Sequence, residues 1–233
     1  MRKVLVTGGT KGIGEGIAIH LRNSGEYNVI TCARDEAADI RCDVTNKTEV
    51  ERMRAEIGQV EILINNVGGV HTAPFLKIDE QEWDWHINVN LKSIYLCTQA
   101  FLPSMIENRW GRIVNIASTA GKIAGRYISA YVAAKHAVIG LTKALALEYA
   151  ETGVTVNAVC PSFVDTPMLR EGAKRAADKT GKSLDQILEQ FRNMNPQKRF
   201  VTSQEVADAV LFLIQNGAVN GQALSICGGE TQV

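Results

Sequence analysis

The sequence lacks a net charge, because 25 Lys and Arg residues balance 25 Asp and Glu residues. Without a basic excess the chain has no general attraction for nucleic acid or for an anionic membrane, so we expect neither as a partner. It also lacks an apolar run that approaches the roughly 18 residues of a membrane span. Because Val4-Leu5-Val6 follows too closely on the first residues for a signal or transit peptide, we expect a cytoplasmic protein.

Cysteine and histidine are few and scattered along the chain. Neither Cys-x-x-Cys spacing nor a metal-ligand spacing of histidines occurs, so we expect reduced thiols and no metal site. The histidines and the tryptophans are expected to serve packing, the surface or a subunit interface. The cysteines are Cys32, Cys42, Cys97, Cys160 and Cys227, the histidines are His20, His71, His86 and His136, and the tryptophans are Trp83, Trp85 and Trp110.

Hydrophobic residues make up 45% of the chain and lie in short β-rich runs between longer helical patterns. Several runs are apolar throughout, which is typical of strands covered on both faces. We predict one α/β domain over residues 1–233, with a Rossmann-type, doubly wound parallel sheet of about seven strands and helices on both faces. The predicted strands are Lys3–Thr7, Asn28–Cys32, Ile40–Val44, Glu61–Asn65, Arg112–Ile116, Thr155–Cys160 and Ala223–Cys227.

Helix signals fill the spaces between these strands. The Ala-rich and Leu-rich stretch Val132–Tyr149 predicts a long interior helix. Thr202 and Glu205 have the spacing of a capping box and predict a helix over Val206–Ile214. The stretch Thr166–Arg199 is polar and helical without a strong apolar stripe. We interpret it as an excursion from the sheet that covers the substrate, at about residues 166–200.

A glycine-rich turn, Thr7-Gly8-Gly9-Thr10-Lys11-Gly12-Ile13-Gly14, follows the first predicted strand. Glycines let a phosphate approach the backbone, and the N–H groups of the following helix bind the anion. Such a turn is weak evidence alone, because it also suits a tight strand-to-helix connection. Its place after the first strand favours a dinucleotide site at the carboxyl ends of the strands.

The end of the second predicted strand, Cys32-Ala33-Arg34-Asp35, lies where the adenosine ribose of a dinucleotide is recognised. Arg34 and Lys11 would pair with a 2′-phosphate, so these two cations favour NADP(H) over NAD(H). Asp35 could instead accept hydrogen bonds from the ribose hydroxyls. Arg34 could also be a solvated turn residue.

Tyr131 and Lys135 are four residues apart and share one face of a predicted helix. An ammonium beside a phenol favours the phenolate, which would lower the tyrosine pKa toward the working pH of a general acid or base. Ser118 follows the predicted strand Arg112–Ile116 and could donate a hydrogen bond to a substrate oxygen. Taken singly, each feature also has a structural explanation.

Together, the glycine turn, Asn65-Asn66-Val67-Gly68, Asn90, Ser118 and Tyr131-x-x-x-Lys135 resemble the short-chain dehydrogenase/reductase family, in order and spacing over nearly the whole chain. The resemblance implies that Tyr131 gives and takes the proton. Lys135 lowers the pKa of that tyrosine and holds the nicotinamide ribose. Ser118 polarises the carbonyl, and Asn90 anchors a water that links Lys135 to solvent.

The resemblance also implies a cofactor site in which Asp43 contacts the adenine and Thr166 holds the carboxamide. The substrate-binding residues are Ser118, Tyr131 and Phe163, and Val70, His71, Met168 and Leu169 are further wall candidates. The complete cofactor set is Gly8, Thr10, Lys11, Gly12, Ile13, Gly14, Arg34, Asp43, Val44, Asn66, Gly68, Tyr131, Lys135, Pro161, Val164 and Thr166.

Three departures from the family pattern bear on the cofactor. Val67 replaces the usual alanine and would crowd the site, and Ser162 replaces the usual glycine after proline and would shift the backbone. The residues between Arg34 and Cys42 are too few for the helix that normally joins the second and third strands. The adenosine end of the cofactor would therefore be more exposed.

The segment Gly111–Met168 and the tail Gly221–Gly229 are similar to 3-oxoacyl thioester reductases and aromatic polyketide ketoreductases. Asp165–Arg199 carries a net charge of +3, which suits a phosphopantetheine-linked substrate but also a solvated helix. A dehydrogenase of a free secondary alcohol and a non-catalytic dinucleotide sensor are the alternatives. The resemblance further implies a homotetramer built on Leu91–Ile106 and Val132–Tyr149.

Overall fold

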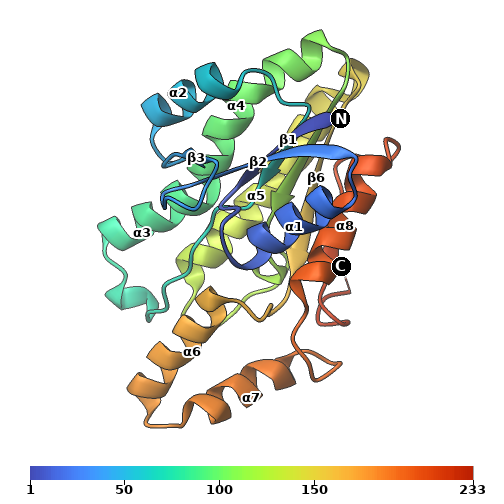
Figure 1. Cartoon of the computed structure of the whole chain (residues 1–233). Helices are drawn as coiled ribbons and strands as arrows, with labels where there is room; N and C mark the ends of the chain where they lie inside the picture. Colours follow the sequence, from blue (N-terminus) through green and yellow to red (C-terminus); the bar gives the residue numbers. More distant parts are fainter. Residues whose placement is uncertain (233) are drawn as a thin grey trace.

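A computed structural model of the protein describes residues 1–232. Within them, seven parallel strands form one sheet in the order β3-β2-β1-β4-β5-β6-β7 (Figure 1). The order reverses between β1 and β4, and such a switch point opens a crevice at the carboxyl ends of the strands. The strands are β1 (Arg2–Thr7), β2 (Tyr27–Ala33), β3 (Ile40–Arg41), β4 (Ile62–Asn65), β5 (Gly111–Ile116), β6 (Val154–Pro161) and β7 (Ala223–Ile226).

Helices cover both faces of the sheet and so bury its apolar strands. On one face lie α1 (Gly12–Asn23) and α8 (Ser203–Gln215). The other face is covered by α2 (Lys47–Ile57), α4 (Ser93–Glu107) and α5 (Ser129–Glu148). The prediction of a Rossmann-type, doubly wound sheet is therefore confirmed. The remaining helices are α3 (Glu80–Ile87), α6 (Pro167–Thr180), α7 (Leu184–Met194), the 3₁₀ turns η1 (Phe75–Lys77), η3 (Thr119–Gly121) and η4 (Ala150–Thr152), and the π-helical turn η2 (Asn88–Lys92).

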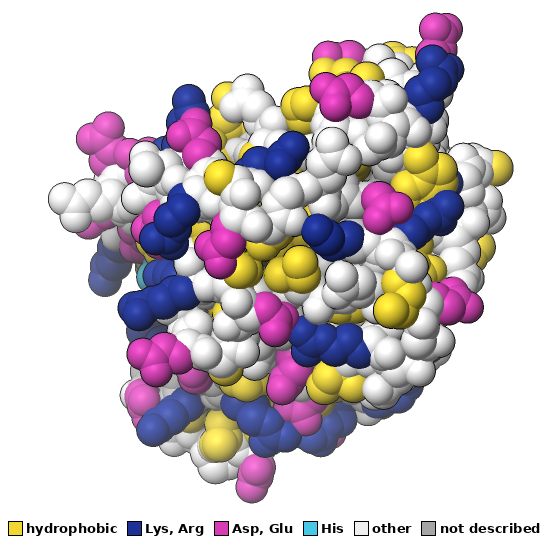
Figure 2. Space-filling view, turned by 45° about the horizontal axis from the view of Figure 1, so that its top comes forward, with side chains coloured by type: hydrophobic (Ala, Val, Ile, Leu, Met, Phe, Trp, Pro, Cys, Tyr) yellow, Lys and Arg dark blue, Asp and Glu magenta, His cyan; other side chains and the backbone are white. Residues whose placement is uncertain are grey.

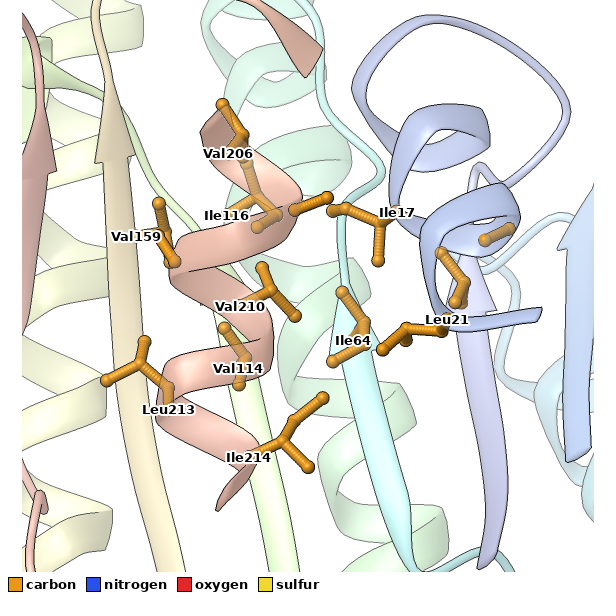
Figure 3. Packing of buried hydrophobic residues seen from close by; sticks show 14 of the residues in the cluster. Ile17, Leu21, Ile64, Val114, Ile116, Val159, Val206, Val210, Leu213 and Ile214 are labelled. Atoms are coloured by element: carbon orange, nitrogen blue, oxygen red, sulfur yellow. The ribbon is translucent and has the colours of Figure 1, made fainter. Parts of the chain in front are cut away.

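The core beneath α1 and α8 shows how the sheet is closed on that face (Figure 3). Ile17 and Leu21 of α1 and Val210 of α8 are fully buried against the sheet. Burial of side chains of this size stabilises the fold by about 1.5–3 kcal/mol each. The two helices thereby fix the strand ends from which the crevice is built.

The third strand is shorter than predicted, since β3 ends at Arg41 and not at Val44. The reason lies in Asp43, whose carboxylate accepts hydrogen bonds from the backbone N–H of Thr45 at 2.9 Å and from its hydroxyl at 2.7 Å. Such a side-chain turn competes with strand pairing. It bends the chain toward α2 directly after Cys42. The other predicted strands are confirmed to within one residue at each end.

The helix signals are confirmed with two differences. Thr202 and Glu205 form the predicted capping box at the start of α8. The long helix begins at Ser129, three residues before the predicted start. The prediction that the stretch 166–199 lacks an apolar stripe is wrong. Ile187 and Leu188 of α7 are buried in a small cluster with Ala173 of α6, away from the sheet (Figure 1).

The expectation that no apolar segment is long enough for a membrane span also needs correction. Helix α5 has 20 residues and a stretch of mean hydropathy 1.2, so by length and composition it could cross a bilayer. One such helix is weak evidence, because core helices of globular proteins have the same properties. Its inner residues Ala134, Val138 and Ile139 are buried in the protein interior. The face in Figure 2 carries basic and acidic side chains intermixed, as the balanced composition predicts.

Candidate active site

The residues singled out in the sequence follow the carboxyl ends of neighbouring strands. Gly8 follows β1, Asn66 follows β4, and Ser118 comes shortly after β5. Thr166 follows β6 and is the N-cap of α6. Because parallel strands end at one edge of the sheet, segments far apart in the sequence meet there.

The glycine turn is fixed by hydrogen bonds to the segment after β4. The Thr7 hydroxyl accepts from the backbone N–H of Asn66 at 2.9 Å and from that of Val67 at 3.2 Å. The Asn66 amide donates to the Thr7 carbonyl at 3.0 Å and to the Gly8 carbonyl at 3.1 Å. A Cβ atom at Gly14 would overlap the Gly8 carbonyl oxygen and the Asn66 amide nitrogen. The turn therefore requires glycine at position 14.

The start of α1 fits the phosphates of a dinucleotide. Gly8 and Gly12 have φ values of +65° and +60°, which L side chains rarely adopt. Lys11 occupies the N-cap, and its side chain makes no capping hydrogen bond among residues 1–232. The N–H groups of the first turn of a helix of this kind can bind an anion. A Cβ atom at Gly12 would lie 3.3 Å from the Thr166 methyl carbon, so the glycine turn also meets the residue predicted to hold the carboxamide.

The adenosine end of the predicted cofactor site is open to solvent. Lys11 and Arg34 are both exposed, while the Thr10 hydroxyl donates to the Asp35 carboxylate at 2.9 Å. As predicted, the described chain forms no helix between β2 and β3.

Asp39, which the sequence did not single out, holds this short connection. Its carboxylate accepts from the backbone N–H and the hydroxyl of Thr31, both at 2.8 Å, and from Arg22 at 2.7 Å. Partial burial raises the pKa of Asp39, but the hydrogen bonds from Thr31 and the charge of Arg22 outweigh it and hold the pKa below its usual value.

Three further cofactor candidates, Val44, Pro161 and Val164, have buried side chains. Their backbones are therefore the groups available to a ligand. The Ser162 hydroxyl, at the position where the family has glycine, donates to the Glu230 carboxylate, and the Ser162 N–H donates to the Ile226 carbonyl at 3.0 Å. The extra side chain is thus accommodated by the tail of the chain.

Tyr131, Lys135 and Ser118 are brought together at the start of α5. Lys135 is only 3% exposed, and its ammonium donates to the Ile116 carbonyl at 2.9 Å. It lies 5.7 Å from the centre of the Tyr131 ring. Burial disfavours the charged form and lowers the pKa of Lys135 to about 8.

The direction of the Tyr131 shift differs from the expectation. Burial raises the pKa of the Tyr131 phenol, and a hydrogen bond with the Ser118 hydroxyl opposes this only in part. The expected lowering by Lys135 does not contribute to this shift, and the Lys135 ammonium donates its hydrogen bond to the Ile116 carbonyl. Tyr131 is therefore held as a neutral phenol, the form that can donate a proton.

Asn90 lies fully buried in the π-helical turn η2 and faces the same group of residues. Its side-chain oxygen accepts from the Gly69 N–H at 3.1 Å, and its amide donates to the Gly69 carbonyl at 2.9 Å. A Cβ atom at Gly68 would lie 2.9 Å from the Asn90 oxygen and 3.4 Å from the Lys135 nitrogen. Gly68 therefore lies close to both polar groups, and π-helical turns such as η2 often occur at functional positions.

Two of the predicted substrate-wall residues, Phe163 and His71, lie in aromatic pairs. Phe163 stacks on Phe191 of α7, with ring centres 5.0 Å apart, so the cover segment contacts this predicted substrate residue. His71 stacks on Trp85 with ring centres 4.0 Å apart. Sequence reasoning missed the role of Trp85 and His86 next to the cleft. No motif identifies them, because they meet His71 across 14 and 15 residues of chain.

Comparisons with known proteins identify the family. Residues 2–177 match the family model described as short chain dehydrogenase. The chain is 39% identical to a Streptomyces coelicolor protein named "Putative ketoacyl reductase", covering 97% of this chain and 95% of that one. It is 37% identical to D-beta-hydroxybutyrate dehydrogenase of Cupriavidus necator, covering 98% and 97%.

Among solved structures, a point variant of actinorhodin polyketide ketoreductase with NADPH superposes with a TM-score of 0.94 at 36% identity, covering 100% of this chain and 98% of that one. The ligand-free aldohexose dehydrogenase of Thermoplasma acidophilum superposes with a TM-score of 0.90 at 34% identity, covering 100% and 96%. The relatives thus include both ketone reductases and alcohol dehydrogenases.

Proposed function

Because the chain belongs to the short-chain dehydrogenase/reductase family, whose enzymes act on CH–OH groups, we propose that it interconverts a ketone and a secondary alcohol with NADP(H). The observation that carries this proposal is the meeting of Ser118, Tyr131 and Lys135 at the carboxyl edge of β5. We further propose a single catalytic domain over residues 1–233, with the segment at about 166–200 as its substrate cover.

The chemistry assigned to these residues follows from their protonation states. The nicotinamide, when bound, supplies the hydride in reduction and accepts it in oxidation. In reduction the Ser118 hydroxyl donates a hydrogen bond to the substrate carbonyl oxygen, and the Tyr131 phenol gives that oxygen its proton. Lys135, as the family resemblance gives it, holds the nicotinamide ribose and places a positive charge 5.7 Å from the centre of the Tyr131 ring. Asn90, beside Gly68 and Lys135, holds the path by which the proton is replaced from solvent.

The preference for NADP(H) is supported by the exposed cations Arg34 and Lys11 at the adenosine end. Asp35, the residue that would favour NAD(H), already accepts a hydrogen bond from Thr10. Two of the similar solved structures are described with NADPH or NADP. The phosphates are assigned to the glycine turn and the carboxamide to Thr166, with the remaining cofactor contacts as the family resemblance gives them.

For the substrate we propose a 3-oxoacyl thioester or a polyketide-type ketone, supported by the similar ketoacyl reductase and polyketide ketoreductase. A free secondary alcohol is the second candidate, because the hydroxybutyrate and aldohexose dehydrogenases are almost as similar. Two assays separate them: oxidation of NADPH and NADH with acetoacetyl-thioester and acetoacetate, and reduction of NADP+ and NAD+ with free secondary alcohols, including sugars. Loss of efficiency on removing the pantetheine arm supports the thioester, and equal efficiency on the free ketone contradicts it.

The proton-transfer role is tested with Tyr131→Phe. We expect turnover to fall about 10²-fold to 10⁴-fold, the contribution of a general acid, with NADPH affinity unchanged by fluorescence titration. Tyr27→Phe, at the amino end of β2 and so at the opposite edge of the sheet, is the matched control and keeps full activity. Near-wild-type turnover of Tyr131→Phe would contradict the role. A chain that binds NADPH but turns over none of the substrates would favour the dinucleotide sensor.

We also propose that copies of the chain associate as a homotetramer through α4 and α5. Tyr95 of α4 is 47% exposed and Leu147 of α5 is 82% exposed, and apolar side chains of this size favour burial at an interface. Elution as a monomer in size-exclusion chromatography contradicts this. A cytoplasmic location is proposed as well, supported by five buried free thiols, and cell fractionation tests it.

A further inference from the structure

His86, in the last turn of α3, is 1% exposed and uses both ring nitrogens. Nδ1 lies 2.9 Å from the Glu82 carbonyl oxygen, and Nε2 lies 3.1 Å from the backbone nitrogen of His71. A carbonyl oxygen can only accept and a backbone N–H can only donate. These partners therefore assign the proton to Nδ1 and make Nε2 an acceptor for the His71 N–H. No other tautomer satisfies both contacts.

The segment Gly69–His71 is consequently held at both ends. At Gly69 the backbone N–H and carbonyl both bond to the Asn90 side chain, and at His71 the backbone N–H bonds to His86. The Asn90 amide also donates to the His86 carbonyl at 3.0 Å. These bonds close a ring that runs from His86 through His71 and Gly69 to Asn90 and back to His86.

Trp85 packs against the outside of this ring of bonds. Its indole stacks on the His71 imidazole with 3° between the planes and meets the His86 ring edge-on at 4.9 Å. A Cβ atom at Gly69 would lie 2.6 Å from the nearest indole carbon, so the backbone at Gly69 lies directly on the ring. The Trp85 indole thus blocks movement of the segment toward it, while the hydrogen bond from the His71 N–H to His86 holds the segment at its other end.

We propose that His86 is a positioning residue for Asn90, which it holds in register with Lys135 through the segment Gly69–His71. The inference rests on the proposed role of Asn90 and Lys135 in proton transfer. Displacement of the segment would move Gly68, whose backbone lies close to both the Asn90 oxygen and the Lys135 nitrogen. Errors of about 1 Å in such a group can cost roughly a hundredfold in rate. Packing alone would not require that both His86 and Asn90 form hydrogen bonds to the backbone of Gly69–His71.

The test compares two substitutions of similar polarity. In His86→Gln the side-chain oxygen reaches the place of Nε2 and can accept from the His71 N–H, whereas in His86→Asn it reaches only the place of Nδ1. Ser104→Ala removes a buried hydrogen bond in α4, away from the site, and serves as the control for general loss of stability. Two readouts apply to the full chain: amide hydrogen exchange of residues 68–73, and kcat with its solvent deuterium isotope effect.

For His86→Asn we expect faster exchange over residues 68–73, kcat lowered about tenfold and a larger solvent isotope effect, with NADPH affinity unchanged. His86→Gln should retain exchange and kcat near those of the wild type. Wild-type exchange or wild-type kcat in His86→Asn overturns the proposal. The proposal also fails if kcat falls in His86→Gln and Ser104→Ala as much as it falls in His86→Asn. If His86→Asn does not fold, loss of kcat in a folded His86→Gln with wild-type exchange also overturns it.

The double variant His86→Asn/Asn90→Ala separates this inference from the proposed function. Because His86 acts through Asn90, the double variant should have the kcat of Asn90→Ala alone. If the loss of kcat in the double variant equals the product of the two single losses, His86 acts by another route. That result overturns the inference and leaves the role of Asn90 intact. Unchanged kcat in Asn90→Ala refutes the proposed role of Asn90, and a tenfold loss in His86→Asn alongside it refutes the inference as well. The exchange data report separately whether His86 holds the segment.

Discussion

The two ends of the cleft differ in how their polar groups are satisfied. At the catalytic end Asn90 is 0% exposed and Lys135 is 3% exposed, and each bonds to backbone carbonyls or N–H groups. At the adenosine end Arg34 and Lys11 project into solvent. A buried polar group must find a fixed partner, because leaving it unpaired costs about 1–3 kcal/mol. The fold therefore fixes the groups proposed for catalysis and leaves those proposed for cofactor choice as exposed side chains.

We expect the largest effect from a substitution in the glycine turn, which lies between the catalytic and adenosine ends. Gly14→Ala places a methyl group on the Gly8 carbonyl oxygen and the Asn66 amide, both of which belong to the rigid turn. We expect a loss of more than about 3 kcal/mol in the free energy of unfolding, by overpacking, and no measurable NADPH binding. Urea denaturation and fluorescence titration check this. Gly140→Ala, at an open position inside α5, should leave NADPH binding unchanged and raise the free energy of unfolding by about 0.5–1 kcal/mol.

The buried end should impose a pH limit on ketone reduction. Since burial lowers the pKa of Lys135 to about 8, the ammonium is present below that pH and is lost above it. We expect kcat/KM to fall above pH 8 by about tenfold per pH unit. In Lys135→Arg the guanidinium stays charged over this pH range. We therefore expect a slower reaction whose kcat/KM does not fall above pH 8. If kcat/KM of Lys135→Arg also falls above pH 8, the pH dependence belongs to another group.

The exposed end should change cofactor choice without changing the chemistry. Arg34→Ala removes the cation that would pair with a 2′-phosphate, so NADPH affinity should fall about tenfold while NADH affinity and kcat stay constant. Lys143→Ala, at an exposed lysine of α5, controls for the change in net charge. An equal loss for NADPH and NADH would place Arg34 outside the 2′-phosphate contact.

The smallest effect concerns Ser162, which lies between the two ends after β6. Ser162→Gly removes its hydrogen bond to Glu230, and we expect a loss of about 1 kcal/mol in the free energy of unfolding with kcat within about twofold. Glu230→Ala should cost a similar amount. In the double variant the losses should not add, because both residues form one bond.

How far the sequence predicted the site depends on how local each feature is. The glycine turn and the Tyr131-Lys135 pair were found because both signals lie within eight residues of chain. The ring of bonds around His86 could not be predicted, because it forms only when α3 and the segment after β4 meet in three dimensions.

The errors have equally physical causes. The direction of the Tyr131 pKa was missed because its main cause is burial of the phenol, which the spacing of Tyr131 and Lys135 does not reveal. The sequence reading of α7 underestimated its apolar face, because Ile187 and Leu188 are buried by α6 and not by the sheet. The early end of β3 depends on one carboxylate, that of Asp43.

The closeness of Gly12 and Thr166 ties two ligand-facing segments together. Thr166 is the N-cap of α6 and accepts a hydrogen bond from the Leu169 N–H, and a Cβ atom at Gly12 would lie 3.3 Å from the Thr166 methyl carbon. The start of α6 therefore lies on the glycine turn, so a change in the shape of that turn would be felt directly at the first turn of α6.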